Sequence, residues 1–155
     1  MRKRSYKQGL YNPVHTEKYK GSHPICYRSS WELMFMKWCD NNSNVVMWGS
    51  ESIAIPYISP KDGRVHRYFV DNIVILKDSH NTIHKYFVEI KPHRQTLPPK
   101  QTGRKKPSTL IKEQYTYAVN MAKWEAAQQY CDKNDIKFTI LTEYDLGLKV
   151  RKNCK

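Results

Sequence analysis

Four large apolar residues near the start of the chain recur at the helical spacing i, i+3, i+4 and i+7: Trp31, Met34, Phe35 and Trp38. This spacing predicts a helix that turns one apolar face toward a core. Ser29, with Glu32 three residues later, matches a capping box and predicts where the helix begins. The polar run at residues 40–42 predicts where it ends.

Segments with the alternation and β-branched content of strands come next, at residues 45–48, 52–58, 64–77, 82–91 and 137–142. Turn-forming residues at 59–63 and 78–81 separate neighbouring segments. A helical pattern runs over residues 108–133, either continuous or broken near Asn120, and the proline-containing stretch 92–107 is predicted to be a loop. The order of helix, antiparallel strands, helix and strand predicts an α/β fold, with a mixed central sheet flanked by helices.

Composition indicates one folded domain with polar ends. The chain has 155 residues, of which 12% are aromatic, a content that disordered chains lack. We predict a basic N-terminal arm at residues 1–26, a single domain at 27–146 and a basic tail at 147–155. No apolar run approaches the ~20 residues that span a bilayer, and the basic N-terminus lacks the apolar segment of a signal peptide. We therefore expect a cytosolic origin and no membrane association.

The net charge of +13 is concentrated in three segments. Six Lys/Arg and one Glu lie within residues 1–20, four Lys/Arg within 149–155, and seven Lys/Arg without any acid within 91–112. Clustered cations of this kind are typical of proteins that bind polyanions, although solvated tails explain the two ends equally well. In the central loop we predict five phosphate contacts with DNA: Arg94, Lys100, Arg104, Lys105 and Lys106.

A carboxylate pair is predicted across the turn at residues 78–81. If this hairpin is centred near residue 80, facing residues have numbers that add to about 160, which brings Asp71 opposite Glu89. Facing side chains lie on one side of a sheet, with Cβ atoms about 5 Å apart. Lys91, two residues beyond Glu89, emerges on the same side.

The surroundings of this pair favour a metal site. The remaining positions of both strands are nearly all apolar. Apolar side chains on both faces are typical of strands that are covered on both faces. Asp71 and Glu89 would repel each other there and are costly to desolvate. A divalent cation resolves this conflict, and oxygen-only ligands favour Mg²⁺ or Mn²⁺ over Zn²⁺. Such an ion activates water and polarises a phosphate, while Lys91 would stabilise the transition state. A structural ion-pair cluster of the same residues is the alternative.

The pattern Val70-Asp71, seventeen residues, then Glu89-Ile90-Lys91 resembles the PD-(D/E)xK nuclease superfamily. This resemblance implies a restriction-endonuclease-like fold, with Asp71 and Glu89 as metal ligands and Lys91 as a catalytic cation. Val70 stands where the motif name has proline, a position that does no chemistry, so the departure matters little.

Three further segments are similar to the TnsA-like subgroup of that superfamily: residues 27–32, 87–92 and 138–143. The first of them resembles the leading helix of the subgroup, whose glutamate joins the metal site. By this resemblance Glu32 is a fourth catalytic position and an auxiliary metal ligand. A role in the helix cap alone is the alternative for Glu32.

Over residues 27–146 the resemblance is greatest to the head-completion nucleases of large tailed phages. It implies a Mg²⁺- or Mn²⁺-dependent deoxyribonuclease acting on double-stranded DNA or DNA ends before the tail joins, with capsid or portal proteins as partners and no small-molecule cofactor. Its location would be the host cytoplasm or the virion head. Two alternatives stay open: a non-catalytic DNA-end-binding or capsid-portal protein on the same fold, and a nuclease that cleaves RNA.

Overall fold

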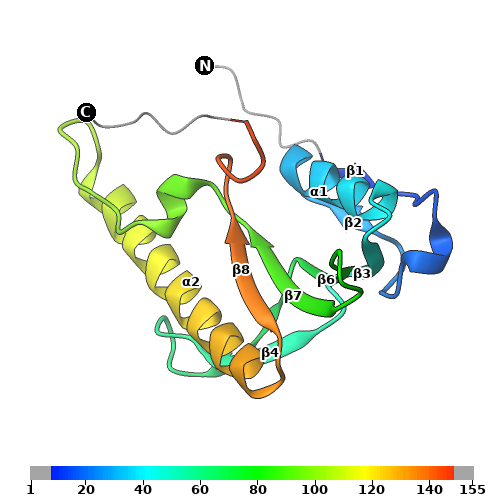
Figure 1. Cartoon of the computed structure of the whole chain (residues 1–155). Helices are drawn as coiled ribbons and strands as arrows, with labels where there is room; N and C mark the ends of the chain where they lie inside the picture. The colour runs from blue at the N-terminus through cyan, green and yellow to red at the C-terminus, as the bar shows by residue number, and fades with distance from the viewer. Residues whose placement is uncertain (1–7, 149–155) are drawn as a thin grey trace, which may run out of the picture.

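The computed structural model describes residues 8–148, and a four-stranded mixed sheet lies at its centre (Figure 1). In spatial order its strands are β3 (Val45–Ser50), β6 (Asn72–Lys77), β7 (Ile83–Ile90) and β8 (Lys137–Leu141). β3, β6 and β7 are antiparallel, whereas β8 runs parallel to β7 because helix α2 (Pro107–Lys133) carries the chain back along the sheet. The predicted α/β fold, with its order of helix, antiparallel strands, helix and strand, is confirmed.

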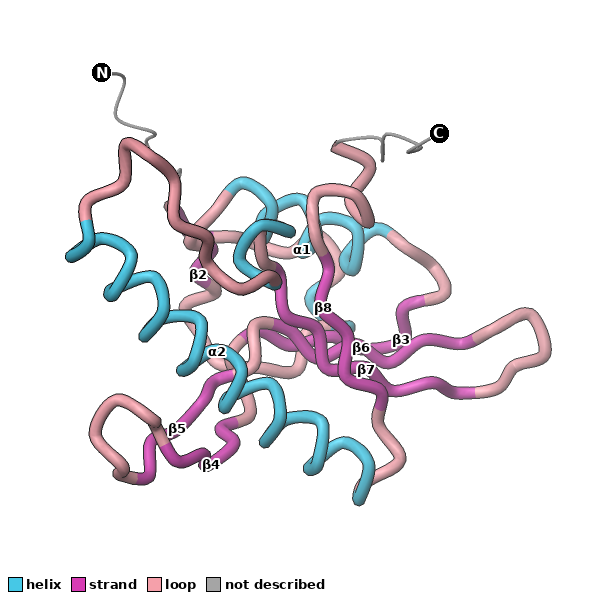
Figure 2. Tube along the Cα trace, turned by 90° about the vertical axis from the view of Figure 1, so that its left-hand side faces the viewer, coloured by secondary structure: helices cyan, strands magenta, loops and turns pink. Residues whose placement is uncertain are grey.

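A second, two-stranded sheet lies outside the central one. β4 (Ala54–Ile58) and β5 (Val65–Phe69) form a hairpin beside α2 (Figure 2). The sequence predicts one strand over residues 64–77, but the chain leaves the hairpin at Phe69 and enters the central sheet at Asn72. The apolar pattern continues through this crossing because Val70 is fully buried there. The pattern therefore hides the junction at which Asp71 lies.

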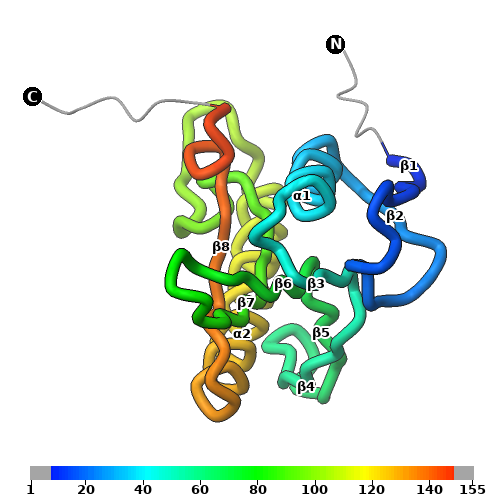
Figure 3. The backbone as a smooth tube through the Cα atoms, turned by 45° about the vertical axis from the view of Figure 1, so that its right-hand side comes forward, coloured from blue at the N-terminus to red at the C-terminus, as the bar shows by residue number. Residues whose placement is uncertain are grey.

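Two cores lie on the two faces of β7. Val88 and Ile90 pack with helix α1 (Ser30–Asn41), whereas Phe87 packs with α2. In Figure 3, α1 lies with β1 (Gly9–Leu10) and β2 (Cys26–Tyr27) on one side of the molecule, and α2 runs along the other. α2 is continuous over 27 residues with Asn120 buried inside it, so the break that the sequence left open does not occur. No helix within residues 8–148 is long and apolar enough to cross a membrane.

Helix α1 begins and ends where the sequence predicts but turns a different face to the core. Ser29 is its N-cap, and Glu32 N donates a hydrogen bond of 3.1 Å to Ser29 Oγ. The buried apolar side chains of α1 are Phe35, Met36 and Cys39. Met34 and Trp38 are 40% and 46% exposed, so the predicted core stripe is wrong for these two. The buried face of α1 is the one that begins with Glu32 and continues through Phe35, Met36 and Cys39. A search for the spacing of large apolar residues misses this face because it starts with a charged residue.

Residues 8–26, which the sequence assigns to a basic arm, fold against the rest of the chain. β1 (Gly9–Leu10) pairs with β2 (Cys26–Tyr27), a single 3₁₀ turn spans Thr16–Lys18, and Tyr19 and Ile25 are buried in the core. The expectation of an arm is wrong for this part of the segment. The remaining residues of the predicted arm, 1–7, and of the predicted tail, 149–155, lie outside the described residues.

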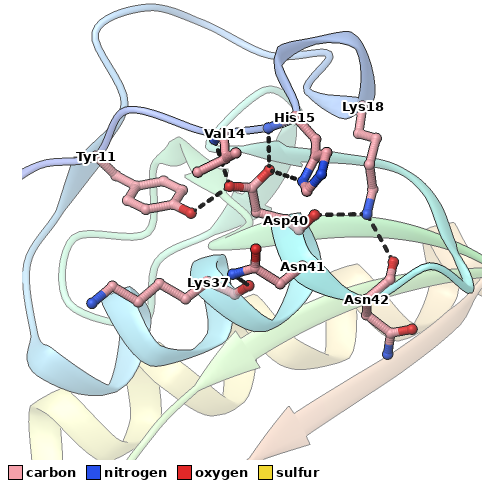
Figure 4. Close-up of polar contacts among 8 residues, drawn as sticks. All are labelled: Tyr11, Val14, His15, Lys18, Lys37, Asp40, Asn41 and Asn42. Atoms are coloured by element: carbon pink, nitrogen blue, oxygen red, sulfur yellow. Dashed lines mark hydrogen bonds and ion pairs between the residues drawn. The ribbon is translucent and has the colours of Figure 1, made fainter.

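Asp40, at the last turn of α1, anchors this N-terminal segment (Figure 4). Its carboxylate is fully buried. The two oxygens accept hydrogen bonds from Tyr11 Oη at 2.7 Å and from the backbone N–H groups of Val14 at 2.7 Å and His15 at 2.9 Å. Lys18 Nζ donates to two carbonyl oxygens at the helix end, 2.9 and 2.7 Å away. A polar anchor between distant segments leaves no hydrophobic period, so the sequence does not reveal it.

Candidate active site

The register of β6 and β7 places Asp71 at the position opposite Glu89. Asn72 pairs with Val88, and Asp71 lies one residue before β6. Ile90 N donates a hydrogen bond of 3.0 Å to Asp71 Oδ2, which fixes this carboxylate at the end of the ladder. The predicted register, with facing numbers that add to 160, is therefore confirmed.

Glu89 is held on both of its oxygens. Its side chain is buried, and the hydroxyl of Tyr68 on β5 donates a hydrogen bond to Oε2. Lys91 Nζ lies 3.4 Å from Oε1, while the Lys91 side chain is still 29% exposed. The structure thus brings Asp71, Glu89 and Lys91 together where β7 ends.

Asp71 lacks enough positive charge around it. Burial raises its pKa well above the ordinary value, and the neighbouring charge of Glu89 raises it further. The charge of Glu32 acts in the same direction, whereas the N–H of Ile90 and the ammonium of Lys91 favour the ionised form. When both are ionised, Asp71 and Glu89 carry two negative charges against the one lysine that pairs with Glu89, and a cation bound between them would offset this local excess.

Glu32 approaches the pair from α1, but its carboxylate takes part in the helix cap. Arg28 N donates a hydrogen bond of 3.0 Å to Glu32 Oε2, and Ser29 Oγ lies 3.4 Å from Oε1. Burial raises the pKa of Glu32, and the hydrogen bond from Arg28 N opposes this shift. The capping role is therefore real, and Glu32 acts on Asp71 through its charge.

The carboxylates face a cleft of about 460 Å³. Its charged side chains come from several elements: Arg28, Glu51, Arg67, Asp71, Glu89, Lys91 and Lys123. Tyr68 also lines it. Lys123 Nζ, from α2, lies 5.8 Å from the ring centroid of Tyr57 and 5.7 Å from that of Tyr68. A cleft of this size holds several waters or a phosphate group with its ion.

Tyr68, Glu51 and Arg28 were not predicted as site residues. Glu51 adopts a left-handed backbone with φ of 48°, and its N–H donates a hydrogen bond of 3.2 Å to the carbonyl oxygen of Asp71. Its side chain forms an ion pair of 2.9 Å with Arg28. Backbone strain of this kind in a non-glycine residue is concentrated at functional sites. No sequence period signals these residues, because they reach the cleft from loops and from the second sheet.

The donor set suits a hydrated ion rather than an enclosed one. Residues 8–148 contain no cluster of three or more His, Cys, Asp or Glu side chains that could hold a metal ion. Mg²⁺ usually keeps several waters and takes one or two carboxylates together with substrate phosphates. Asp71 and Glu89 supply two carboxylates on an open cleft, so the residues present fit an ion of this type.

The predicted phosphate contacts lie in the segment 92–107 and not on the walls of the cleft. This segment is not a loop throughout, because a 3₁₀ turn spans His93–Thr96 and contains Arg94. Four of them are exposed: Arg94, Lys100, Arg104 and Lys106. Lys105 Nζ lies 2.7 Å from Glu113 Oε2 and also donates to the carbonyl oxygen of Lys100, so part of its charge is neutralised within the chain. The cations that do line the cleft are Arg28, Arg67, Lys91 and Lys123.

Two comparisons with known proteins show the family to which the chain belongs. Residues 42–143 match the family described as TnsA-like endonuclease N terminal, a span that contains Asp71, Glu89 and Lys91 but not Glu32. The chain is also 42% identical over 141 residues to the head completion nuclease of Enterobacteria phage T4, an alignment that covers 87% of this chain and 90% of that protein. This chain belongs to the TnsA-like endonuclease family and is a homologue of the phage T4 head completion nuclease.

Proposed function

We propose that this chain hydrolyses phosphodiester bonds of duplex DNA with Mg²⁺ or Mn²⁺ at Asp71 and Glu89. The observation that carries the proposal is the carboxylate pair itself: an Asp71 whose pKa is raised, a buried Glu89 and a single Lys91 beside an open cleft. Such an arrangement costs stability, and a divalent cation held by the two carboxylates would relieve the repulsion. Because the phage relative is a head completion nuclease, we propose packaged DNA ends as the natural substrate and capsid or portal proteins as partners.

The contacts of each side chain define its role. A bound divalent ion would supply an activated water and polarise the phosphate. Asp71 Oδ2 is fixed by Ile90 N, whereas its Oδ1 has no hydrogen-bond partner within residues 8–148 and is free to bind the ion. Lys91 offsets the negative charge that gathers on the phosphate in the transition state. Glu32 keeps the start of α1 in place. Its charge acts on Asp71, and it would serve as an auxiliary ligand of the ion.

Cleavage of supercoiled and linear duplex DNA tests this function, and Lys91→Ala is expected to slow it by about 10²–10³-fold. The substitution removes one ion pair of 3.4 Å from a partly exposed side chain, so the protein should stay folded. The wild type is expected to cut with Mg²⁺ or Mn²⁺ and to stop when the ion is chelated. Lys85→Ala, an exposed lysine earlier on β7, is the matched control and should cut at the wild-type rate.

Other outcomes of this assay have definite meanings. Duplex binding without cleavage, whichever ion is present, would favour the non-catalytic DNA-end-binding or capsid-portal protein. Preferential cutting of RNA would change the substrate while keeping the site. Full activity in Lys91→Ala would contradict its role as the catalytic cation.

Tyr68→Phe is expected to slow cleavage by about tenfold and to raise the concentration of Mg²⁺ required for half-maximal rate. The substitution leaves Glu89 Oε2 as a buried acceptor without its donor, which costs about 1–3 kcal/mol of folding free energy. The Glu89 carboxylate is then no longer held in one orientation. Initial rates over a Mg²⁺ titration measure this effect. Tyr57→Phe is the control, because its ring also contacts Lys123 but does not touch Glu89. A half-saturating Mg²⁺ concentration that does not change in Tyr68→Phe would contradict this positioning role.

A further inference from the structure

The β4–β5 hairpin has one buried and one exposed face. The buried face packs against α2 through Ile55, Tyr57 and Tyr68. The opposite face consists of three cross-strand pairs in register: Ala54 with Phe69, Pro56 with Arg67, and Ile58 with Val65. Ile58, Val65 and Phe69 are 65%, 69% and 47% exposed. A small sheet that leaves such large apolar side chains in solvent is typical of a binding surface.

This exposed face is continuous with the proposed active-site cleft. Arg67 and Phe69 belong to the face and also line the cleft that contains Asp71 and Glu89. The guanidinium carbon of Arg67 lies 5.9 Å from the ring centroid of Phe69, a stacking contact that restrains the arginine. Figure 2 shows the hairpin set apart from the central sheet, so its outer face is not covered by another element of the described chain.

We propose that the exposed face of the β4–β5 hairpin binds a groove of the duplex and holds the DNA across the cleft, with Arg67 on a phosphate beside the scissile bond. The inference rests on the proposed function, since it assigns the substrate-binding surface of the same site. A two-stranded antiparallel ribbon is one of the elements that the major groove admits. Apolar side chains on it contact thymine methyl groups and sugars, and Arg67 supplies the charge that matches phosphate.

Charge favours DNA over a second protein as the occupant. The hairpin and its turn carry Lys61, Arg64 and Arg67 against the single acid Asp62, and Asp62 is already paired with His66 at 2.7 Å. Arg28 and Lys123 add further cations on the cleft that the face borders. Each of these cations can displace a counterion from a DNA phosphate, which favours the binding of DNA.

Two variants separate the apolar and the ionic parts of this surface. Ile58→Thr with Val65→Thr replaces one cross-strand pair by another β-branched pair, so the strands keep their propensity. Arg67→Gln removes the charge of the guanidinium and, with it, the stacking on Phe69. Affinity is measured by fluorescence anisotropy of a labelled 30-base-pair duplex in EDTA at several salt concentrations, and oligomeric state by light scattering. Controls of the same chemistry are Val46→Thr on β3, whose side chain is 45% exposed, and Lys85→Gln on β7.

Each hairpin variant is expected to bind the duplex about tenfold more weakly than the wild type, while the controls bind normally. Arg67→Gln should reduce the slope of log affinity against log salt by about one, and the threonine pair should leave that slope unchanged. Wild-type affinity in both hairpin variants would overturn the inference, and DNA cleavage by the wild type would then still support the nuclease. Loss of a dimer in the threonine variant, with unchanged DNA affinity, would assign the face to a second copy and also overturn it. Weakened binding in a protein that never cuts would support this surface and reject the nuclease function.

Discussion

Asp71→Asn is expected to abolish DNA cleavage, with a loss of at least about 10³-fold, and at the same time to stabilise the protein at neutral pH. The loss of activity follows from removing the charge of a proposed metal ligand, which is worth several kcal/mol in the transition state. The gain in stability follows from the burial of the ionised Asp71 carboxylate and, second, from its repulsion by Glu89. An asparagine oxygen still accepts the hydrogen bond from Ile90 N, so the backbone contact is kept.

The sign of the stability change depends on pH in a defined way. Burial, and then the charge of Glu89, raise the pKa of Asp71 in the folded protein above its ordinary value of 3.8. Below that value the side chain is protonated in both states, and it does not alter the free energy of unfolding. As the pH rises, ionised Asp71 increasingly destabilises the fold, fully so above the raised pKa. The variant should therefore gain about 1 kcal/mol, or about 2–4 °C in Tm, at neutral pH and nothing in strong acid.

Urea unfolding of the wild type and Asp71→Asn at pH 7.5 and at pH 3 measures this difference. Asp78→Asn is the matched control, because hydrogen bonds from His84 and the N–H of Thr82 lower the pKa of Asp78. That control should lose stability at neutral pH and cut DNA normally. A variant of Asp71 that is inactive and also less stable at pH 7.5 would contradict the charge repulsion, while an active one would contradict the proposed site.

The sequence predicts the juxtaposition of Asp71 and Glu89 because this pairing depends on local geometry. A turn at residues 78–81 fixes the register of the two strands beside it, so Asp71 and Glu89 face each other for the same reason that Asn72 pairs with Val88. The capping box works in the same way, since Ser29 and Glu32 lie within one helical turn. Features that depend on neighbours in sequence are thus recovered without any knowledge of the tertiary structure.

The walls of the cleft could not be predicted, because they come from segments distant in sequence. Tyr68 reaches Glu89 only because the chain crosses from the hairpin to the central sheet at Val70. In the sequence this crossing is hidden, because β5 and β6 together read as one apolar stretch. The phosphate contacts predicted from charge alone fall in the segment 92–107, whereas Arg28 and Arg67 line the cleft. A local cluster of lysines and arginines in the sequence shows where charge lies along the chain, but not whether those side chains face the cleft.

The N-terminal segment shows the same limit most clearly. Residues 8–26 contain the core residue Ile25 and also Tyr19, and both line the cleft. Their attachment depends on Asp40. Burial alone would raise the pKa of Asp40, but hydrogen bonds from Tyr11 and from two backbone N–H groups outweigh this effect, so the pKa is lowered. The ionised form of Asp40 is therefore a stabilising element, in contrast to Asp71.

Asp40→Asn is expected to destabilise the protein by about 3 kcal/mol at neutral pH, because an amide cannot accept all the hydrogen bonds that the buried carboxylate accepts. Tm should fall by roughly 6–12 °C, and residues 8–26 should exchange their amide hydrogens faster than the central sheet. Asp132→Asn, which loses only an exposed contact with Gln128, is the control and should change stability little.

The stabilisation by Asp40 is fully present above the ordinary carboxyl pKa of 3.8 and is lost as the pH falls through its lowered value. The wild type and Asp40→Asn should therefore converge in strong acid, as the wild type and Asp71→Asn do, but from the opposite side. Because Tyr19 and Ile25 form part of the cleft, Asp40→Asn should also lose DNA cleavage at a lower temperature than the wild type. Normal amide protection of residues 8–26 in this variant would show that the segment is held by its apolar contacts and that Asp40 is not its anchor.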